Sequence, residues 1–252
     1  MAGHNKWSKV KHIKGAVDAK RGKLFSKLSR EITVAARDGA DTDLNPRLRQ
    51  AMAAARAQNM PGDTIERALK KGTGELEGQA YEEALYEAYG PGGVAFLIEA
   101  VTDNRHRTAA DLRHLLSKNH GTWADAGSVA YQFDRKGHIR LPVDAIDEDR
   151  LLAIVLEHGA EDLQQQGDEH VITTAHDKLF AVVQELKDRM LEPSTAELIY
   201  QPQNLIEVTE PAHARQVIRL YDLLDDYDDT QNVFANFELA ASVAEELSTQ
   251  HA

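Results

Sequence analysis

The side chains that most often carry catalytic or metal chemistry occur in this sequence without the spacings that such chemistry needs. The 252-residue chain has no cysteine, which excludes disulfides, thiolate metal sites and a cysteine nucleophile. Its 11 histidines include no His-Glu-x-x-His pair for zinc, and no serine lies in a Gly-x-Ser-x-Gly nucleophile elbow. We therefore predict that the protein is not an enzyme, and we assign it no metal, cofactor or small-molecule substrate.

A run of aspartates at the end of a predicted helix is the strongest acidic feature. Clustered carboxylates bind Mg²⁺ or Ca²⁺ in many proteins, but this run lacks the alternating ligands and the glycine of an EF-hand loop. Acidic residues at a helix C-terminus are mildly unfavourable, which hints at a use. We interpret the run as a contact for a basic partner, and a solvated acidic edge or a metal site are the alternatives. The residues of this contact are Asp225, Asp226, Asp228 and Asp229.

The beginning of the chain has the residue types that bind nucleic acid. Within the first 30 residues, nine Lys and Arg stand against Asp18 alone. Lysines neutralise phosphates, and rings between them stack on bases. A solvated, disordered basic tail is the alternative. The residues assigned to nucleic-acid binding in this region are Lys6, Trp7, Lys9, Lys11, His12, Lys14, Lys20, Arg21, Lys23 and Lys27.

A second basic motif spans residues 103–108, Asp-Asn-Arg-His-Arg-Thr, where a predicted strand gives way to a helix. Arginines beside a helix N-terminus suit the recognition of phosphate or carboxylate. We assign Asn104, Arg105 and Arg107 to nucleic-acid binding as well. The alternative is surface charge next to a helix that Thr108 and Asp111 cap.

The net charge of −12 hides a separation of charge along the chain. Residues 1–77 contain 16 Lys and Arg against 9 Asp and Glu, a balance of +7, and the remainder contains 13 against 32, a balance of −19. A polyanion is attracted to the first part and repelled by the second.

The basic part has the pattern of a small helical domain, residues 1–77. Apolar residues from Val17 to Asp38 recur on one face, and lysines and Arg30 share an adjoining face. Asn45 followed by proline predicts a second helix start. Asp63 with Glu66 three residues on predicts a capping box for a third helix, so we expect a three-helix bundle over residues 17–72.

Beyond residue 78 the pattern alternates between strands and helices, so we predict a multidomain α+β protein. Residues 137–202 follow the β-α-β-β-α-β order of a ferredoxin-like unit, inserted in a discontinuous α+β domain of residues 79–135 and 203–240, with a tail over 241–252. Gly90-Pro91-Gly92-Gly93 predicts a hairpin turn rather than a phosphate loop. The predicted strands are 81–89, 94–102, 128–133, 138–141, 171–174, 197–201, 205–208 and 232–237, and the predicted helices are 108–119, 148–158, 177–190 and 211–224.

The most apolar stretches, Val94–Val101 and Leu151–Leu156, are far shorter than the roughly 20 residues of a membrane-spanning helix. We therefore expect no membrane contact and a cytoplasmic protein. An organellar transit peptide is the alternative interpretation of the basic, acid-poor start.

Motifs along the whole chain resemble those of the YebC/PmpR family. The opening Met-Ala-Gly-His-Asn-Lys-Trp is followed in the family's order by further motifs. These are Lys11–Gly15, Asp18–Lys23, Asn59-Met60-Pro61, Thr64–Ala68, Tyr89–Ala95, Thr102–Thr108, Gly127-Ser128-Val129, Pro202-Gln203-Asn204, and Asp229 with Gln231-Asn232-Val233. The chain departs from the family pattern at Gly121-Thr122-Trp123-Ala124, where relatives commonly have Gly-Asn-Leu-Gly, and Ala126 is likewise atypical.

The resemblance implies a helical first domain and two α+β domains, the third inserted in the second. It also implies a function: members are described as DNA-binding transcriptional regulators, or as translation factors that bind the ribosome and relieve stalling at proline-rich stretches. We predict a non-enzymatic regulator of gene expression whose partner is DNA or ribosomal RNA. The charge distribution leans toward the ribosome, which offers RNA to the basic residues 1–16 and basic proteins to the acidic domains. We call residues 1–16, which show no apolar periodicity and which we expect to be extended, the arm. An acidic protein-interaction module is a further alternative.

Overall fold

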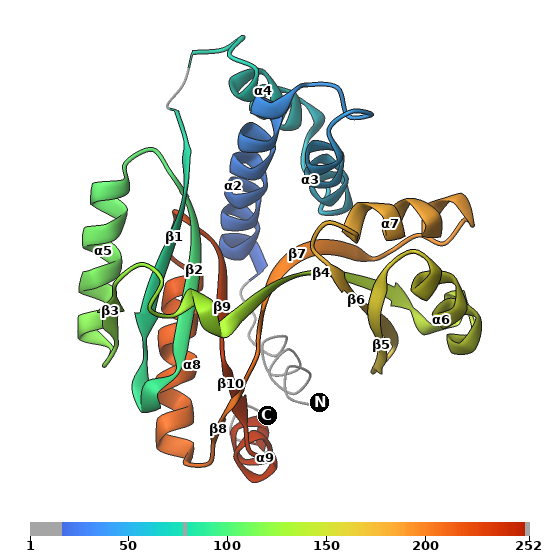
Figure 1. The fold of residues 1–252 in the computed structure, drawn as a ribbon. Coiled ribbons are helices and arrows are strands. Elements are labelled where there is room, and N and C mark those ends of the chain that lie inside the picture. Colours follow the sequence, from blue (N-terminus) through green and yellow to red (C-terminus); the bar gives the residue numbers. More distant parts are fainter. Residues whose placement is uncertain (1–16, 78–79, 250–252) are drawn as a thin grey trace. The chain divides into compact units, whose positions relative to one another are not determined.

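The computed structural model describes residues 17–77 and 80–249, which Figure 1 draws in colour. For residues 17–21 and 248–249 only the backbone is described. The predicted contacts Lys6, Trp7, Lys9, Lys11, His12 and Lys14, and the side chains of Lys20 and Arg21, therefore lie outside the described part. The chain divides into two compact units, a larger one of residues 1–132 with 202–252 and an inserted one of residues 133–201.

Helices form the first described part of the larger unit. They are α2 (Val17–Ala35), continued by the 3-10 turn η1 (Ala36–Asp38), α3 (Pro46–Ala57) and α4 (Gly62–Gly72). Their apolar faces share one core, in which Ile32, Leu48 and Ile65 are buried. The predicted three-helix bundle is confirmed.

The starts of α3 and α4 differ in how they are capped. The Asn45 side chain accepts a hydrogen bond from the Leu48 N–H (2.9 Å), so the predicted start of α3 is confirmed. The predicted capping box of α4 is wrong, because this helix begins at Gly62 after Pro61 and its N-cap has no side-chain hydrogen bond. Glu66 pairs instead with Lys70 one turn on, at 2.6 Å.

An α+β domain with a four-stranded sheet makes up the rest of the larger unit. Its elements are β1 (Glu82–Tyr89), η2 (Pro91–Gly93), β2 (Ala95–Thr102), α5 (Arg105–Lys118), β3 (Thr122–Ala124), η3 (Ala130–Gln132), β8 (Ile206–Val208), α8 (Pro211–Asp225), β9 (Thr230–Ala235), β10 (Phe237–Leu239) and α9 (Ala241–Thr249). The sheet order is β3-β1-β2-β9, and β8 pairs with β10 in parallel. β1 and β2 form the predicted hairpin, closed by the Gly90 N–H donating to the Val94 carbonyl at 2.8 Å.

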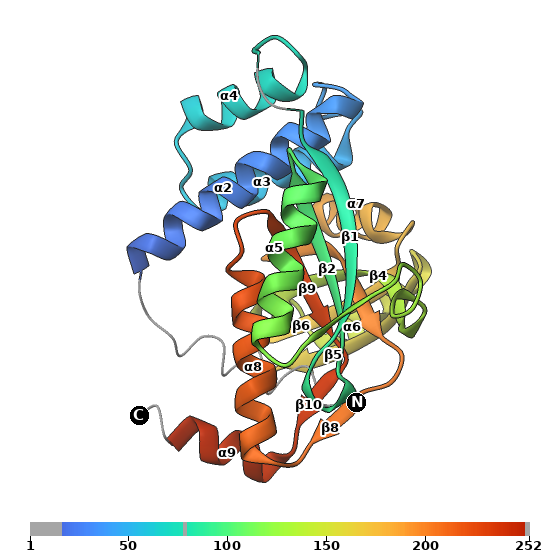
Figure 2. The ribbon, with the colours of Figure 1, turned by 90° about the vertical axis from the view of Figure 1, so that its left-hand side faces the viewer.

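Helices α5 and α8 lie side by side on one face of this sheet (Figure 2). Leu116 of α5 and Leu220 of α8 are buried with Phe96 and Ile98 of β2 in a single core. Burying each such side chain stabilises the fold by about 1.5–3 kcal/mol. This core therefore fixes α5 and α8 relative to the sheet.

The predicted strand over 128–133 is wrong. Residues Ala130–Gln132 form η3, and Phe133 begins the next strand. The backbone donors here are used by the buried carboxylate of Glu87, which accepts the N–H groups of Gly127 (2.6 Å), Val129 (2.5 Å) and Ala130 (2.9 Å). A strand ladder is excluded because these donors are already bound.

The expected C-terminal tail over 241–252 contains helix α9. Val243 and Leu247, four residues apart and so on one face of the helix, are buried in the core of the α+β domain. This pair accounts for the difference, since one apolar face is enough to dock a short helix.

The inserted unit has the ferredoxin-like fold that the element order predicts. Its elements are β4 (Phe133–Pro142), the 3-10 turn η4 (Val143–Ala145), α6 (Glu148–Glu157), β5 (Ala160–Gln166), β6 (Glu169–Ala175), α7 (Leu179–Asp188) and β7 (Thr195–Pro202). The sheet order is β5-β6-β4-β7, antiparallel at β4–β6 and β5–β6. Leu151 of α6 and Leu179 of α7 are buried with Ile139 in its core. β4 begins at Phe133, before the expected boundary at residue 137.

Among the described residues, no helix combines the length and apolar character that crossing a lipid bilayer requires. The same residues contain no group of three or more His, Asp or Glu arranged to hold a metal ion.

Candidate nucleic-acid interface

Three cations lie on one face of α2. Lys23, Lys27 and Arg30 follow one another at the four- and three-residue spacings that bring helix side chains into line. Opposite them lies the connection between α8 and β9, within the larger unit. We call its four acidic residues the aspartate segment: Asp225, Asp226, Asp228 and Asp229.

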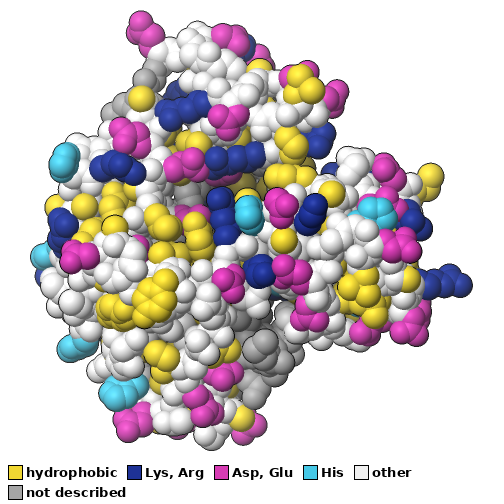
Figure 3. All heavy atoms as spheres, in the orientation of Figure 1, with side chains coloured by type: hydrophobic (Ala, Val, Ile, Leu, Met, Phe, Trp, Pro, Cys, Tyr) yellow, Lys and Arg dark blue, Asp and Glu magenta, His cyan; other side chains and the backbone are white. Residues whose placement is uncertain are grey.

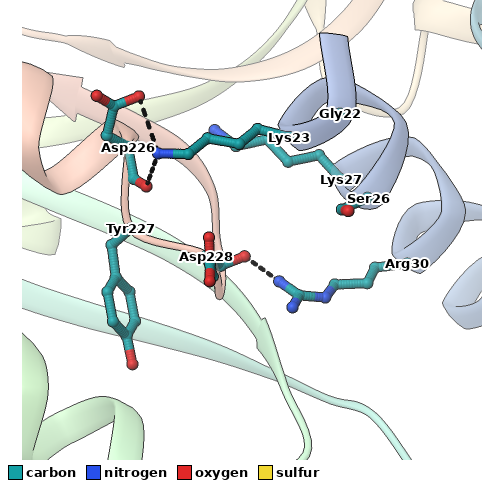
Figure 4. A pocket seen from close by; sticks show the side chains of 8 residues that line it. All are labelled: Gly22, Lys23, Ser26, Lys27, Arg30, Asp226, Tyr227 and Asp228. Atoms are coloured by element: carbon teal, nitrogen blue, oxygen red, sulfur yellow. Dashed lines mark hydrogen bonds and ion pairs between the residues drawn. The ribbon is translucent and has the colours of Figure 1, made fainter. Parts of the chain in front are cut away.

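The α2 cations bind both carboxylates and backbone carbonyls of this connection, and Figure 4 shows the contacts of Lys23 with Asp226 and of Arg30 with Asp228. The Lys23 Nζ donates to the Asp226 carbonyl (2.9 Å) and lies 3.6 Å from its carboxylate. The Lys27 Nζ donates to the Asp225 carbonyl (3.0 Å) and carboxylate (3.1 Å). Arg30 donates to the Asp228 carbonyl and lies 3.4 Å from the Asp229 carboxylate.

The negative charge at the C-terminal end of α8 explains why the α2 cations bind there. The last turn of α8 has no basic residue, and both its last residue, Asp225, and its C-cap, Asp226, are acidic. The last carbonyls of a helix carry a partial negative charge, which aspartates reinforce and cations offset. Helix α2 supplies those cations. In this structure the basic groups that face the aspartate segment therefore come from the same chain.

Burial increases along the row. The side chains of Lys23 and Asp226 are 45% and 64% exposed, whereas those of Arg30 and Asp229 are 17% and 5% exposed. Exposed ion pairs contribute little because water screens them. The Arg30 end of the row is thus the fixed end, and the Lys23 end is open to solvent.

Asp229 is the centre of a buried polar network. Its Oδ2 accepts hydrogen bonds from the hydroxyl of Thr108 (2.7 Å), from the Arg107 Nη2 (2.7 Å) and from the hydroxyl of Thr102 (3.2 Å). Burial alone would raise the pKa of Asp229, but the hydrogen bonds from Thr108 and Arg107 and the charges of Arg107 and Arg30 outweigh it and lower this pKa. Asp229 is therefore a stable anion.

Tyr227 completes the same network. Its hydroxyl donates to the Asp111 carboxylate at 2.9 Å. Burial, this hydrogen bond and the charge of Asp229 raise the pKa of Tyr227 to about 12. The surrounding hollow has a volume of about 340 Å³ and also borders Arg30 and Tyr81. A neighbouring hollow of about 220 Å³ lies between α2 and the aspartate segment.

The residues of the second predicted motif, 103–108, have two different roles: Asn104 and Arg107 make contacts within the fold, and Arg105 is exposed. Asn104 is the N-cap of α5 and accepts from the Arg107 N–H (3.0 Å), so the predicted caps Thr108 and Asp111 are wrong. Arg107 binds Asp229 and Asp103, each at 2.7 Å. The Arg105 side chain donates to the Glu83 carbonyl (2.9 Å) and is 57% exposed. Arg105 is thus the motif's more accessible cation.

The structure adds residues that the sequence motifs did not assign. Arg30 lies on the predicted basic face but was not among the nucleic-acid contacts, although its spacing from Lys27 is the signal that finds it. Thr102 and Thr108 carry no such signal, because nothing local indicates a carboxylate more than a hundred residues away. On the face drawn in Figure 3, described Lys and Arg side chains are interspersed with Asp and Glu.

Two family models match the chain. The one described as the TACO1/YebC protein N-terminal domain matches residues 5–75, and the one described as the TACO1/YebC second and third domain matches residues 81–237. Together they include the helical bundle, the α+β sheet and the whole inserted unit.

Relatives of similar length are named probable transcriptional regulatory proteins. One from Desulfatibacillum aliphaticivorans is 52% identical over 240 residues, which cover 95% of this chain and 97% of the relative. Another from Desulfosudis oleivorans is 49% identical over 246 residues, or 97% of this chain and 100% of the relative. A crystal structure of a conserved hypothetical protein from Aquifex aeolicus, 44% identical, matches with a TM-score of 0.82 over 90% of this chain and 94% of its own.

Proposed function

Since this chain belongs to the TACO1/YebC family, we propose that it is a non-enzymatic regulator of gene expression that binds nucleic acid through its basic N-terminal region. The proposal places the protein in the cytoplasm. Support comes from the naming of its relatives as probable transcriptional regulatory proteins and from the charge pattern of the first 30 residues.

The observation that carries the proposal is the row of cations on α2. In the sequence this row directly continues the lysines of residues 6–14, so one basic stretch extends from the arm into a folded helix. Three cations on one helix face provide positive charge that can neutralise phosphates, which is the main source of electrostatic affinity for nucleic acid. Arg105, exposed beside the N-terminus of α5, is the proposed second contact.

The arm is tested by the salt dependence of binding. In a Lys9→Gln/Lys11→Gln/Lys14→Gln variant the log–log slope of affinity against salt should flatten by about 0.9 for each duplex phosphate that the arm no longer neutralises, or about 0.7 on a single strand. The matched control is Arg150→Gln/Lys178→Gln/Lys187→Gln, which removes three exposed cations of the inserted unit. Equal slopes in the two variants would reject the arm as a binding element.

The names of the relatives favour DNA as the partner, and the acidic remainder of the chain favours the ribosome. The net charge of −19 on the residues after 77 limits extended contact with a DNA duplex, because DNA is also negative. Ribosomal particles, in contrast, present basic proteins as well as RNA. Sedimentation of nuclease-treated lysate, with DNA removed and ribosomes intact, separates the two. Migration with ribosomal particles supports the translational role, and its absence together with retention on duplex DNA supports the transcriptional one.

A further inference from the structure

We propose that the aspartate segment is an intramolecular mask, which competes with nucleic-acid phosphates for the cations of α2. The inference rests on the proposed function, because it concerns the same basic surface. Its starting point is that Lys23, Lys27 and Arg30, the described continuation of the basic arm, all have acidic or carbonyl partners within the chain.

The acceptors that surround these cations resemble those of a phosphodiester backbone. Each is an oxygen with a full or partial negative charge, and all of them belong to one short stretch of the chain, residues 225–231. Three such oxygens lie within 3.3 Å of the Lys27 Nζ: the Asp225 carboxylate, the Asp225 carbonyl and the Gln231 carbonyl. A strand of nucleic acid must displace these oxygens to bind the same cations.

The gradient of burial allows that exchange without unfolding. The Lys23–Asp226 pair is exposed, and the Lys27–Asp225 pair is intermediate, with side chains 21% and 28% exposed. Asp229, at the buried end, is held by Thr102, Thr108 and Arg107 as well as by Arg30. The outer two pairs therefore open while the buried network stays in place.

The mask is tested by neutralising its three less buried acids and leaving the buried Asp229 intact. The variant is Asp225→Asn/Asp226→Asn/Asp228→Asn, and the matched control is Glu157→Gln/Asp168→Asn/Glu192→Gln, three exposed acids of the inserted unit. Both change the net charge by the same amount. The probes are a labelled single-stranded RNA of mixed sequence and a duplex DNA of the same sequence, each titrated over a range of salt concentrations.

The mask variant should bind the probe at least about tenfold more tightly than the control variant at moderate salt. Its log–log slope should be steeper by up to about 0.9 per α2 cation that gains a duplex phosphate, or about 0.7 on a single strand. In the wild type the slope is flatter, since salt also weakens the mask that binding must open. A control variant that gains as much affinity and slope would overturn the mask.

The outcomes separate this inference from the proposed function. Salt-dependent binding by the wild type, with the mask variant no better than the control, rejects the mask and keeps the nucleic-acid function. No binding of either probe by any of the proteins rejects the proposed function, and the mask with it. Tighter binding by the mask variant that Lys23→Gln/Lys27→Gln abolishes supports both.

A crosslink tests the same mask on a single protein. The chain has no cysteine, and Ser26 of α2 and Asp228 both border the hollow between the two elements (Figure 4). In the Ser26→Cys/Asp228→Cys variant, a short cleavable bis-maleimide should hold the mask closed. We expect the crosslinked protein to bind the RNA more weakly and to recover its affinity when the linker is cleaved. Equal affinity before and after cleavage would contradict the mask.

Discussion

Arg107 and Asp229 lie 122 positions apart in the sequence, and 2.7 Å separates the Arg107 Nη2 from the Asp229 Oδ2. The contact connects the first turn of α5 to the residue before β9, and Thr102 and Thr108 bind the same carboxylate oxygen. Asp229 thus joins the strand β2, the start of α5 and the α8–β9 connection within the larger unit. Its network underlies the first two predictions.

Replacing Asp229 with alanine should destabilise the larger unit. The hydroxyls of Thr102 and Thr108 would lose a buried acceptor, and an unsatisfied buried polar group costs about 1–3 kcal/mol. We expect a decrease of that size in the free energy of unfolding at pH 7, measured with urea. Asp226→Ala is the control, since its exposed ion pair contributes about 0–1 kcal/mol. An equal loss in both variants would contradict a central role for Asp229.

The contribution of Asp229 should depend on pH. Its folded pKa is below the ordinary value of 3.8, so its charge stabilises the fold above that value and loses this effect as the pH falls through the folded pKa. The difference in unfolding free energy between the wild type and Asp229→Asn should therefore be constant from about pH 7 to 5 and shrink below about pH 4. Urea titrations of both proteins at several pH values measure it. A difference that grows on acidification would show the opposite shift.

Glu87 should control the order of the segment before the inserted unit. Its carboxylate accepts the N–H groups of Gly127, Val129 and Ala130, and a glutamine offers only one acceptor oxygen in the same space. In Glu87→Gln we expect faster hydrogen exchange at these three amides and a loss of about 1.5–3 kcal/mol in the free energy of unfolding. Glu83→Gln, on the same strand and exposed, is the control. Unchanged exchange at the three amides would show that the carboxylate is not their main partner.

Replacing Arg105 by glutamine and replacing Arg107 by glutamine should have different effects on DNA binding and on stability. Arg105→Gln should reduce the salt slope of duplex DNA binding by about 0.9 with little effect on stability, because this side chain is mostly exposed. Arg107→Gln should lower the free energy of unfolding, because it removes a cation from Asp229. Binding titrations and urea unfolding of both variants measure the contrast. If Arg105→Gln lowered the free energy of unfolding and left duplex DNA binding unchanged, Arg105 would have only a structural role.

Much of the fold follows from local sequence signals. Asn45 before proline predicts the start of α3 because an Asx side chain satisfies the free N–H groups of a helix end. The element order of the inserted unit predicts its ferredoxin-like sheet because connection rules leave few ways to arrange two β-α-β passages. The same local signals place the wrong strand over 128–133, since they contain no information on the Glu87 carboxylate that binds its amides.

By itself, the sequence determined the charge separation, the helix that carries Lys23 and Lys27, and the aspartates that follow α8. These features depend on residue type and on spacing within one element. Only the tertiary structure decided that these cations face those aspartates, and that Asp229 binds Thr102, Arg107 and Thr108. The physical reason is that a carboxylate accepts any donor brought within hydrogen-bond distance. Packing of α5 and α8 on one sheet selects which donors those are.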